Sequence, residues 1–181
     1  IVEADAMVLA GTSTGTSADL DTTTGSITDD GTANVTITGN ADVNTVDDSL
    51  ITLNDTLAFG TLTFNGGAIT IVEADAMVLA GTSTGTSADL DTTTGSITDD
   101  NTANVTIIGN ADVNTVDDSL ITLDDTYAFG TLTFNGGAIT IVEADAMDLT
   151  GTSTGTSADL DATGAITDTA AASTTIADIT D

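Results

Sequence analysis

Short runs of alternating apolar and polar residues recur along the chain, separated by turn-forming residues. Asn34-Val35-Thr36-Ile37-Thr38 is one such run, and Ser49-Leu50-Ile51-Thr52-Leu53 is another. Alternation with a period of two predicts half-buried β-strands, and clusters of Gly, Asn and Asp predict turns between them. The acidic segment Glu3-Ala4-Asp5-Ala6 is also expected to turn. Helix is not expected, because β-branched residues, Gly and Asp dominate. The pattern therefore predicts an all-β fold.

The strand pattern repeats with a period of 70 residues. Residues 1–70 and 71–140 are identical at all but a few positions, and a third, more divergent copy occupies residues 141–181. The differences between the first two copies are Gly31/Asn101, Thr38/Ile108, Asn54/Asp124 and Leu57/Tyr127. Ile108 and Tyr127 are expected near the surface, because a narrow core tolerates such changes poorly. Both ends of the chain suggest a fragment of a longer array.

Each copy contains a weaker internal repeat. Aligned on the first apolar residue of a strand, its sub-units begin at Leu20, Val43, Leu62 and Leu90. Constant strand patterns with loops of variable length are typical of the coils of a parallel β-solenoid. The sequence therefore predicts one continuous solenoid over residues 1–181, with about three coils in each full copy. The main alternative is a string of separate β-sandwich domains, one for each copy.

Composition adds an extreme negative charge to this picture. The chain has 29 acidic residues and no Lys, Arg or His, which gives a formal net charge of −29. Nucleic-acid binding through phosphate neutralisation is excluded, because it requires cationic side chains. Attraction to an anionic membrane is excluded for the same reason, and no run approaches the roughly 20 apolar residues that cross a bilayer. The expected partners are cations and other copies of the chain.

No catalytic set is recognisable in the sequence. Without His, Cys or Lys, only paired carboxylates could act, as they do in glycoside hydrolysis. Such pairs need dissimilar surroundings that separate their pKa values, whereas near-identical copies repeat the same surroundings. An enzyme is therefore not expected.

The densest group of acidic and amide side chains recurs in both complete copies. Closely spaced carboxylate and amide oxygens suit Ca²⁺, which takes six to eight oxygen ligands. The candidate ligands are Asp42, Asn44, Asp47, Asp48, Asp112, Asn114, Asp117 and Asp118. Their spacing differs from that of the EF-hand loop, which leaves a solvated acidic turn as the alternative.

The solenoid alignment places further acids beside these candidates. It stacks Asp19 on Asp42 and Asp21 on Asn44, so that carboxylates about 4.8 Å apart repel one another and favour cation binding. Thr-x-Thr pairs suggest an ice-binding face as an alternative. The same alignment puts Asp21, Asn44 and Thr63 in one column, and a threonine face is therefore not expected.

Four segments resemble a known family. They are residues 62–64 (Leu-Thr-Phe), 67–71 (Gly-Ala-Ile-Thr-Ile), 79–82 (Leu-Ala-Gly-Thr) and 164–168 (Gly-Ala-Ile-Thr-Asp). The chain is similar to the β-strand repeats of very large secreted bacterial proteins related to filamentous haemagglutinin. This resemblance implies a right-handed parallel β-helix that forms the shaft of an extracellular or cell-surface fibre. The alternative is an adhesin stalk whose binding domain lies outside this sequence. Unpaired strand edges at the ends of a solenoid also favour self-association, end to end or side by side, into fibres.

Overall fold

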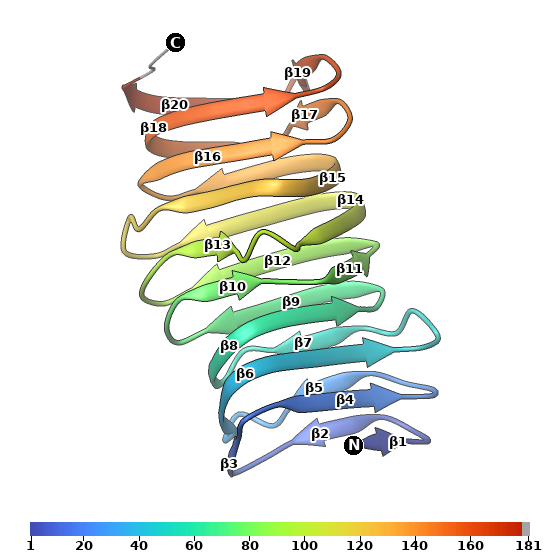
Figure 1. The fold of residues 1–181 in the computed structure, drawn as a ribbon. Helices are drawn as coiled ribbons and strands as arrows, with labels where there is room; N and C mark the ends of the chain where they lie inside the picture. The colour runs from blue at the N-terminus through green and yellow to red at the C-terminus, as the bar shows by residue number, and fades with distance from the viewer. Residues whose placement is uncertain (179–181) are drawn as a thin grey trace.

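The computed structural model describes residues 1–178, which form β-strands and no helix. The strands pair in parallel and wind into a β-solenoid of about eight coils of about 21 residues each (Figure 1). The prediction of an all-β parallel solenoid is confirmed, and the alternative of separate β-sandwich domains is wrong. Within residues 1–178 there is accordingly no helix of the length and apolar character needed to cross a membrane.

Two long stacks of strands run from the first coil to the last. The first stack contains β1 (Val2–Glu3), β4 (Ala18–Thr22), β6 (Asn34–Thr45), β8 (Thr56–Asn65), β10 (Met77–Leu79), β13 (Ile97–Asp99), β15 (Ile121–Asn135), β16 (Ala138–Glu143) and β18 (Thr152–Ala162). The second stack contains β2 (Met7–Leu9), β5 (Ile27–Asp29), β7 (Ile51–Leu53), β9 (Ala68–Glu73), β12 (Ser87–Thr92), β14 (Asn104–Thr115), the end of β15, β17 (Met147–Leu149) and β19 (Ile166–Asp168).

Three further strands complete the coils. They are β3 (Thr12–Gly15), β11 (Thr82–Gly85) and β20 (Ser173–Asp178), and they pair with the beginnings of β6, β14 and β18. The long strands bend at corners of the coil, so that β15 starts in the first stack and ends in the second.

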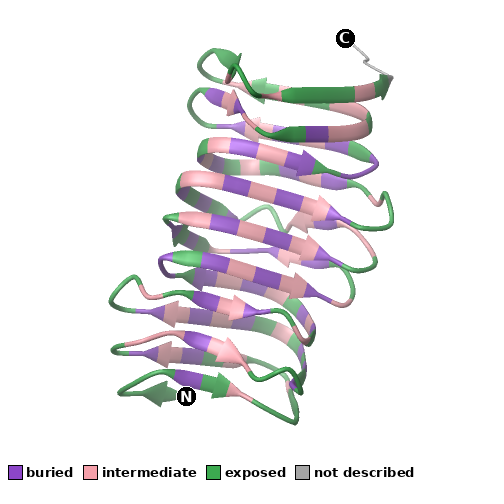
Figure 2. Ribbon diagram, turned by 180° about the vertical axis from the view of Figure 1, so that it is seen from behind, coloured by how far each residue is buried: buried purple, intermediate pink, exposed green. Residues whose placement is uncertain are grey.

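Inward-facing residues of the strands fill a narrow aliphatic interior. On β9, Ile69, Ile71 and Glu73 are buried and alternate with more exposed residues, as the banding along the strands in Figure 2 shows. The alternation follows from the strand geometry, in which successive side chains point to opposite faces. Glu3 was expected to begin a turn, but it ends strand β1, and its counterpart Glu73 ends strand β9 and faces the interior.

The register of the coils differs in part from the predicted alignment. Leu20 pairs with Val43 as expected, but Val43 pairs with Phe64 and not with Leu62. Leu62 and Phe64 both face inward, so the apolar pattern alone does not distinguish the two registers. A register shift in the β6–β8 pairing, just beyond Ile37, adds to the offset.

Corresponding strands of successive copies lie in different stacks. Strand β4 belongs to the first stack and its counterpart β12 to the second, while β5 and its counterpart β13 show the reverse. Starting at Ile27, the paired residues of successive coils are Ile51, Ile69, Ala88 and Ala111.

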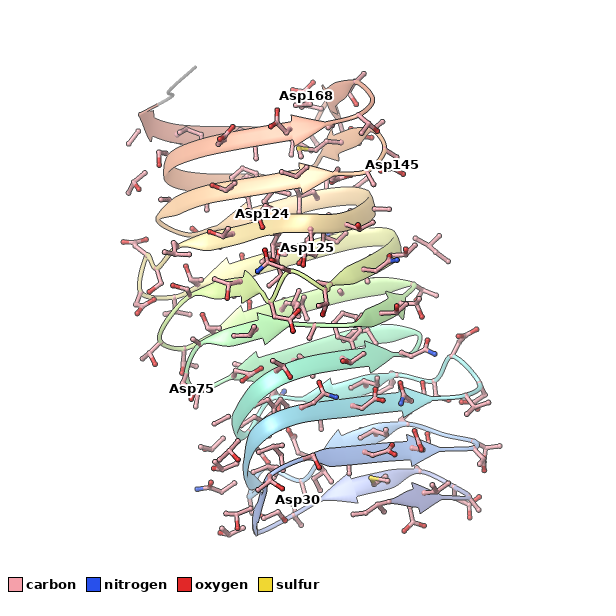
Figure 3. All side chains as sticks on the ribbon, in the orientation of Figure 1. Asp30, Asp75, Asp124, Asp125, Asp145 and Asp168 are labelled. Carbon is pink, nitrogen blue, oxygen red and sulfur yellow. The ribbon has the colours of Figure 1, made fainter. Side chains whose placement is uncertain are left out.

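The counterpart of Ile27 in the second copy is Ile97, which lies in the sequence between the third partner, Ala88, and the fourth, Ala111. A copy therefore spans more than three coils and fewer than four. The corresponding residues Asp75 and Asp145 accordingly lie on opposite edges of the stack in Figure 3. Surface groups of one copy thus recur on another side of the solenoid in the next.

Candidate cation-binding sites

Two of the predicted ligands in each copy lie on the outer face of a strand. Asp42 pairs with Asp19 and Asn44 with Asp21 in the adjacent coil, as predicted. Asn44 Nδ2 donates a hydrogen bond to Asp21 Oδ1 at 3.1 Å. We call these four residues the first acidic quartet.

The second copy repeats the arrangement in the other stack. Its members are Asp89, Asp91, Asp112 and Asn114, which we call the second acidic quartet. Asn114 Nδ2 donates to Asp91 Oδ1 at 2.9 Å. The strand ladder brings together residues that lie 23 positions apart in the sequence. The quartets therefore appear on alternating sides of the solenoid.

Burial and repulsion between carboxylates disfavour the charged form of Asp42 in the first quartet and of Asp89 and Asp112 in the second. Burial raises the pKa of Asp89 to about 6, and the neighbouring carboxylates of Asp91 and Asp112 add to the shift. Burial likewise raises the pKa of Asp42 and of Asp112. Asp112 Oδ1 is buried without a hydrogen-bond partner. Because the chain contains no Lys, Arg or His, protons or external cations must compensate these charges.

The other predicted ligands lie in the turn that follows the strand. Asp47 Oδ2 accepts a hydrogen bond from Gly25 N at 3.2 Å, and Asp117 Oδ2 accepts one from Gly95 N at 3.1 Å. Hydrogen bonding to Ser49 and to the Gly25 N–H lowers the pKa of Asp47. Asp48, with a φ of 55°, shapes the turn itself. The carboxylates of Asp47 and Asp117 therefore have a structural role in the turn, whereas Asp48 contributes through its backbone.

The predicted set consequently occupies two places in each copy. Within residues 1–178, no three of its carboxylates bring oxygens within 4.8 Å of one another. Binding of Ca²⁺ by Asp42, Asn44, Asp47 and Asp48, and by their counterparts in the second copy, remains a prediction.

One acidic cluster was predicted only in part from the sequence, in which the Asp99-Asp100 pair is a weaker cation candidate than the set above. Asp99, Asp124 and Asp125 each offer an oxygen within 4.8 Å of the others, and Figure 3 labels two of them near the middle of the stack. Asp99 Oδ2 accepts hydrogen bonds from Asp124 N at 2.8 Å and from Tyr127 Oη at 3.0 Å. Asp125 Oδ2 accepts one from Ala103 N at 2.9 Å.

A signal for this cluster was present in the sequence. Two of the differences between the copies, Asn54/Asp124 and Leu57/Tyr127, lie at this one place. The first copy has an amide where the second has its third carboxylate. The cluster is therefore specific to the second copy.

The expected exposure is confirmed for one of the substituted residues and wrong for the other. Ile108 is 76% exposed, whereas Tyr127 is fully buried. The Tyr127 ring packs at 5.6 Å from that of Phe129, and its hydroxyl reaches Asp99. A phenol can occupy the interior because its polar end extends to a carboxylate at the surface.

The observed register also changes the alignment that was used against an ice-binding face. Asn44 pairs with Asp21 and Asn65, and Thr63 does not lie in that column. Thr28, Thr52 and Thr70 are paired in successive coils. The outward neighbours of Thr70 on β9 are Ala68 and Val72, however, so these threonines form a single file. They do not form the two-dimensional array of a flat threonine face.

We expect Ca²⁺ to raise the thermal unfolding midpoint, because it relieves carboxylate repulsion in the quartets. The measurement is circular dichroism with Ca²⁺ and with a chelator. The double variant D42N/D112N should lose most of this increment, whereas D124N, which restores the residue of the first copy, tests the Asp99 cluster separately. Equal midpoints with Ca²⁺ and chelator in the unsubstituted chain would exclude a specific site.

In comparisons with protein-family models, with curated proteins and with solved structures, nothing matches this chain. The fold that the resemblance to filamentous-haemagglutinin-like repeats implies agrees with the structure, a parallel β-solenoid of about eight coils. Membership of that family has no support from these comparisons.

Proposed function

We propose that the chain is a structural protein that forms part of the shaft of a secreted bacterial fibre, outside the cell or at its surface. The observation that carries this proposal is strand pairing that continues from one copy into the next. Strand β9 crosses from the first copy into the second and pairs with β12 of the second over six residue pairs. Strand β16 crosses from the second copy into the third and pairs with β18 of the third in the same way. A stack of this kind lengthens by whole copies without a hinge.

The interior supports the same role. The largest buried side chains of one copy, such as Phe64 and Leu62, have counterparts in Phe134 and Leu132 that are equally buried. A shaft needs a uniform cross-section, and interiors that differ little between the copies supply it; the buried exception is Leu57, which is Tyr127 in the second copy. We further propose that the solenoid is right-handed, which is the hand implied by the resemblance to filamentous haemagglutinin.

External cations are part of this proposal. The chain carries a net charge of −29 with no internal counter-charge, and the quartets concentrate carboxylates on its sides. Ca²⁺ bound there would reduce the repulsion between neighbouring coils and between neighbouring shafts. We also propose that chains associate into fibres through the unpaired strand edges at the ends of the solenoid. Bound cations would assist this association by reducing the repulsion between the acidic chains.

A second candidate function is that of an adhesin stalk. The same rigid stack would then hold a binding domain, encoded elsewhere in a longer protein, away from the cell. A full-length product with a non-repetitive terminal domain would favour the stalk, and one made of repeats throughout would favour the fibre.

We expect electron microscopy to show rods of uniform width, with a fibre-diffraction spacing of about 4.8 Å along the axis. A matched variant lacks residues 71–140, which preserves the repeat across the junction. Its rods should be shorter by a constant length and otherwise unchanged. Particles that resemble beads joined by flexible segments would contradict the proposal.

A further inference from the structure

Two glutamates lie inside the solenoid. Glu73 ends strand β9 and Glu143 ends strand β16, and both are 0% exposed. Their counterpart in the first coil, Glu3, lies in the same local sequence and is exposed. Burying an ionised carboxylate is very costly unless a positive partner or several hydrogen bonds compensate it. The chain has no Lys, Arg or His that could serve as that partner.

The hydrogen bonds around the two carboxyl groups are too few to hold a negative charge. Glu73 Oε2 accepts one bond from Phe59 N at 2.9 Å, and Glu73 Oε1 has no partner. Neither carboxyl oxygen of Glu143 has a hydrogen bond of normal geometry, although the Phe129 N–H and the Asp145 carboxyl lie close enough to influence its pKa. Each glutamate ends its strand beside a backbone hydrogen bond to the adjacent coil. The bond is from Ala74 N to Leu57 O at 2.7 Å after Glu73, and from Ala144 N to Tyr127 O at 2.7 Å after Glu143.

Every titratable group on the elements packed against these glutamates is itself acidic. Beside Glu73, strand β8 has no titratable residue, β12 carries Asp89 and Asp91, and Asp75 follows in the turn. Beside Glu143, Asp145 follows in the turn. The neighbouring strands β15 and β18 carry Asp124, Asp125, Tyr127, Asp159 and Asp161. None of these groups carries a positive charge that could pair with a buried carboxylate, and the Tyr127 hydroxyl donates its hydrogen bond to Asp99.

We propose that Glu73 and Glu143 close the solenoid as neutral carboxylic acids, so that the fold carries a proton-dependent switch at each of these two positions. The proton neutralises the carboxylate in the absence of a cationic side chain. Removing the proton leaves a buried negative charge and lowers the stability of the fold. The proposal concerns regulation of the fold and does not depend on whether the chain forms a fibre.

The direction of the pH dependence follows from burial. Burial raises the pKa of Glu73 from 4.5 to about 8, and the Phe59 N–H offsets this only in part. Burial raises the pKa of Glu143 to about 7. A pKa raised by folding adds stability that is complete below the unfolded value of 4.5 and is lost as the pH rises through the folded values of about 7 and 8. The free energy of unfolding of the solenoid should therefore be higher in mild acid than in base.

The test compares the variant E73Q/E143Q with the charge-matched control E3Q/D5N, whose residues are exposed. Glutamine keeps the shape of the side chain and an oxygen that can accept the Phe59 bond. In urea unfolding between pH 5 and pH 9, the unsubstituted chain and the control should lose stability as the pH rises. Each glutamate contributes up to about tenfold in the folding equilibrium per pH unit inside its window. The E73Q/E143Q variant should lack this component and be the more stable protein at pH 9.

Infrared spectroscopy supplies a readout that does not depend on unfolding. The folded, unsubstituted chain at pH 6 should show the carbonyl band of a protonated, buried carboxylic acid, and the single variants E73Q and E143Q should each remove part of it. Either of two results would overturn the proposal: absence of this band, or an E73Q/E143Q variant with the pH dependence of the control.

Discussion

Replacing Phe134 by alanine is expected to lower the free energy of unfolding by about 3–5 kcal/mol. The Phe134 side chain is fully buried, and its residue pairs with Val113 in the adjacent coil. Removing the ring leaves a cavity between coils whose spacing is held by backbone hydrogen bonds, so the neighbouring coils cannot collapse into it. Urea unfolding monitored by circular dichroism measures the loss.

Two comparisons make this prediction specific. Phe64→Ala should cost about as much as Phe134→Ala, because corresponding residues surround the two rings although they lie in different stacks. Phe134→Leu keeps most of the volume and should cost less than about 1.5 kcal/mol. A loss below about 1 kcal/mol for Phe134→Ala, or clearly unequal losses at the two positions, would show that the copies do not share one interior.

Replacing Gly130 by alanine is expected to destabilise the protein by about 3 kcal/mol or more. A Cβ atom at this position would overlap the backbone carbonyl of Ile108 in the adjacent coil. At Gly60, the corresponding residue, a Cβ would lie 2.8 Å from the carbonyl carbon of Thr38. Backbone atoms in a strand ladder cannot rotate away as a side chain can, so the coils would have to separate. Thermal unfolding measures the effect.

The chain offers a matched control in Gly31→Asn. Gly31 has a φ of +83° and free space around it, and the second copy already has Asn101 at this position with a φ of 67°. This substitution should change the free energy of unfolding by no more than about 0.5 kcal/mol. If Gly130→Ala were as mild as Gly31→Asn, the close approach of coils at this corner would be refuted.

Local patterns were sufficient to predict the class of fold. Alternation of apolar and polar residues depends on strand geometry alone, and the 70-residue repeat is visible without coordinates. Together they predicted a parallel solenoid and the pairing of Asp19 with Asp42, which the structure confirms. The exposure of Ile108 was predicted from its substitution for Thr38, although the same reasoning was wrong for Tyr127.

Other features depended on how the coils stack. Choosing Phe64 over Leu62 as the partner of Val43 required the register, because both residues are apolar and face inward. The acidic cluster in the second copy required residues 25 positions apart to meet. The burial of Tyr127 depended on a surface carboxylate, Asp99, within reach of its hydroxyl. None of these contacts leaves a periodic trace in the sequence.

The amino-acid sequence by itself determined that this protein is a repetitive, acidic stack of parallel strands, because strand alternation and composition are local properties. Only the tertiary structure decided which side of the stack each copy presents and that Glu73 and Glu143 lie inside it. The reason is that coil lengths, set by bulges and corners, add up along the chain. Over several coils, a difference of one or two residues in each coil therefore moves a side chain from one side of the solenoid to another.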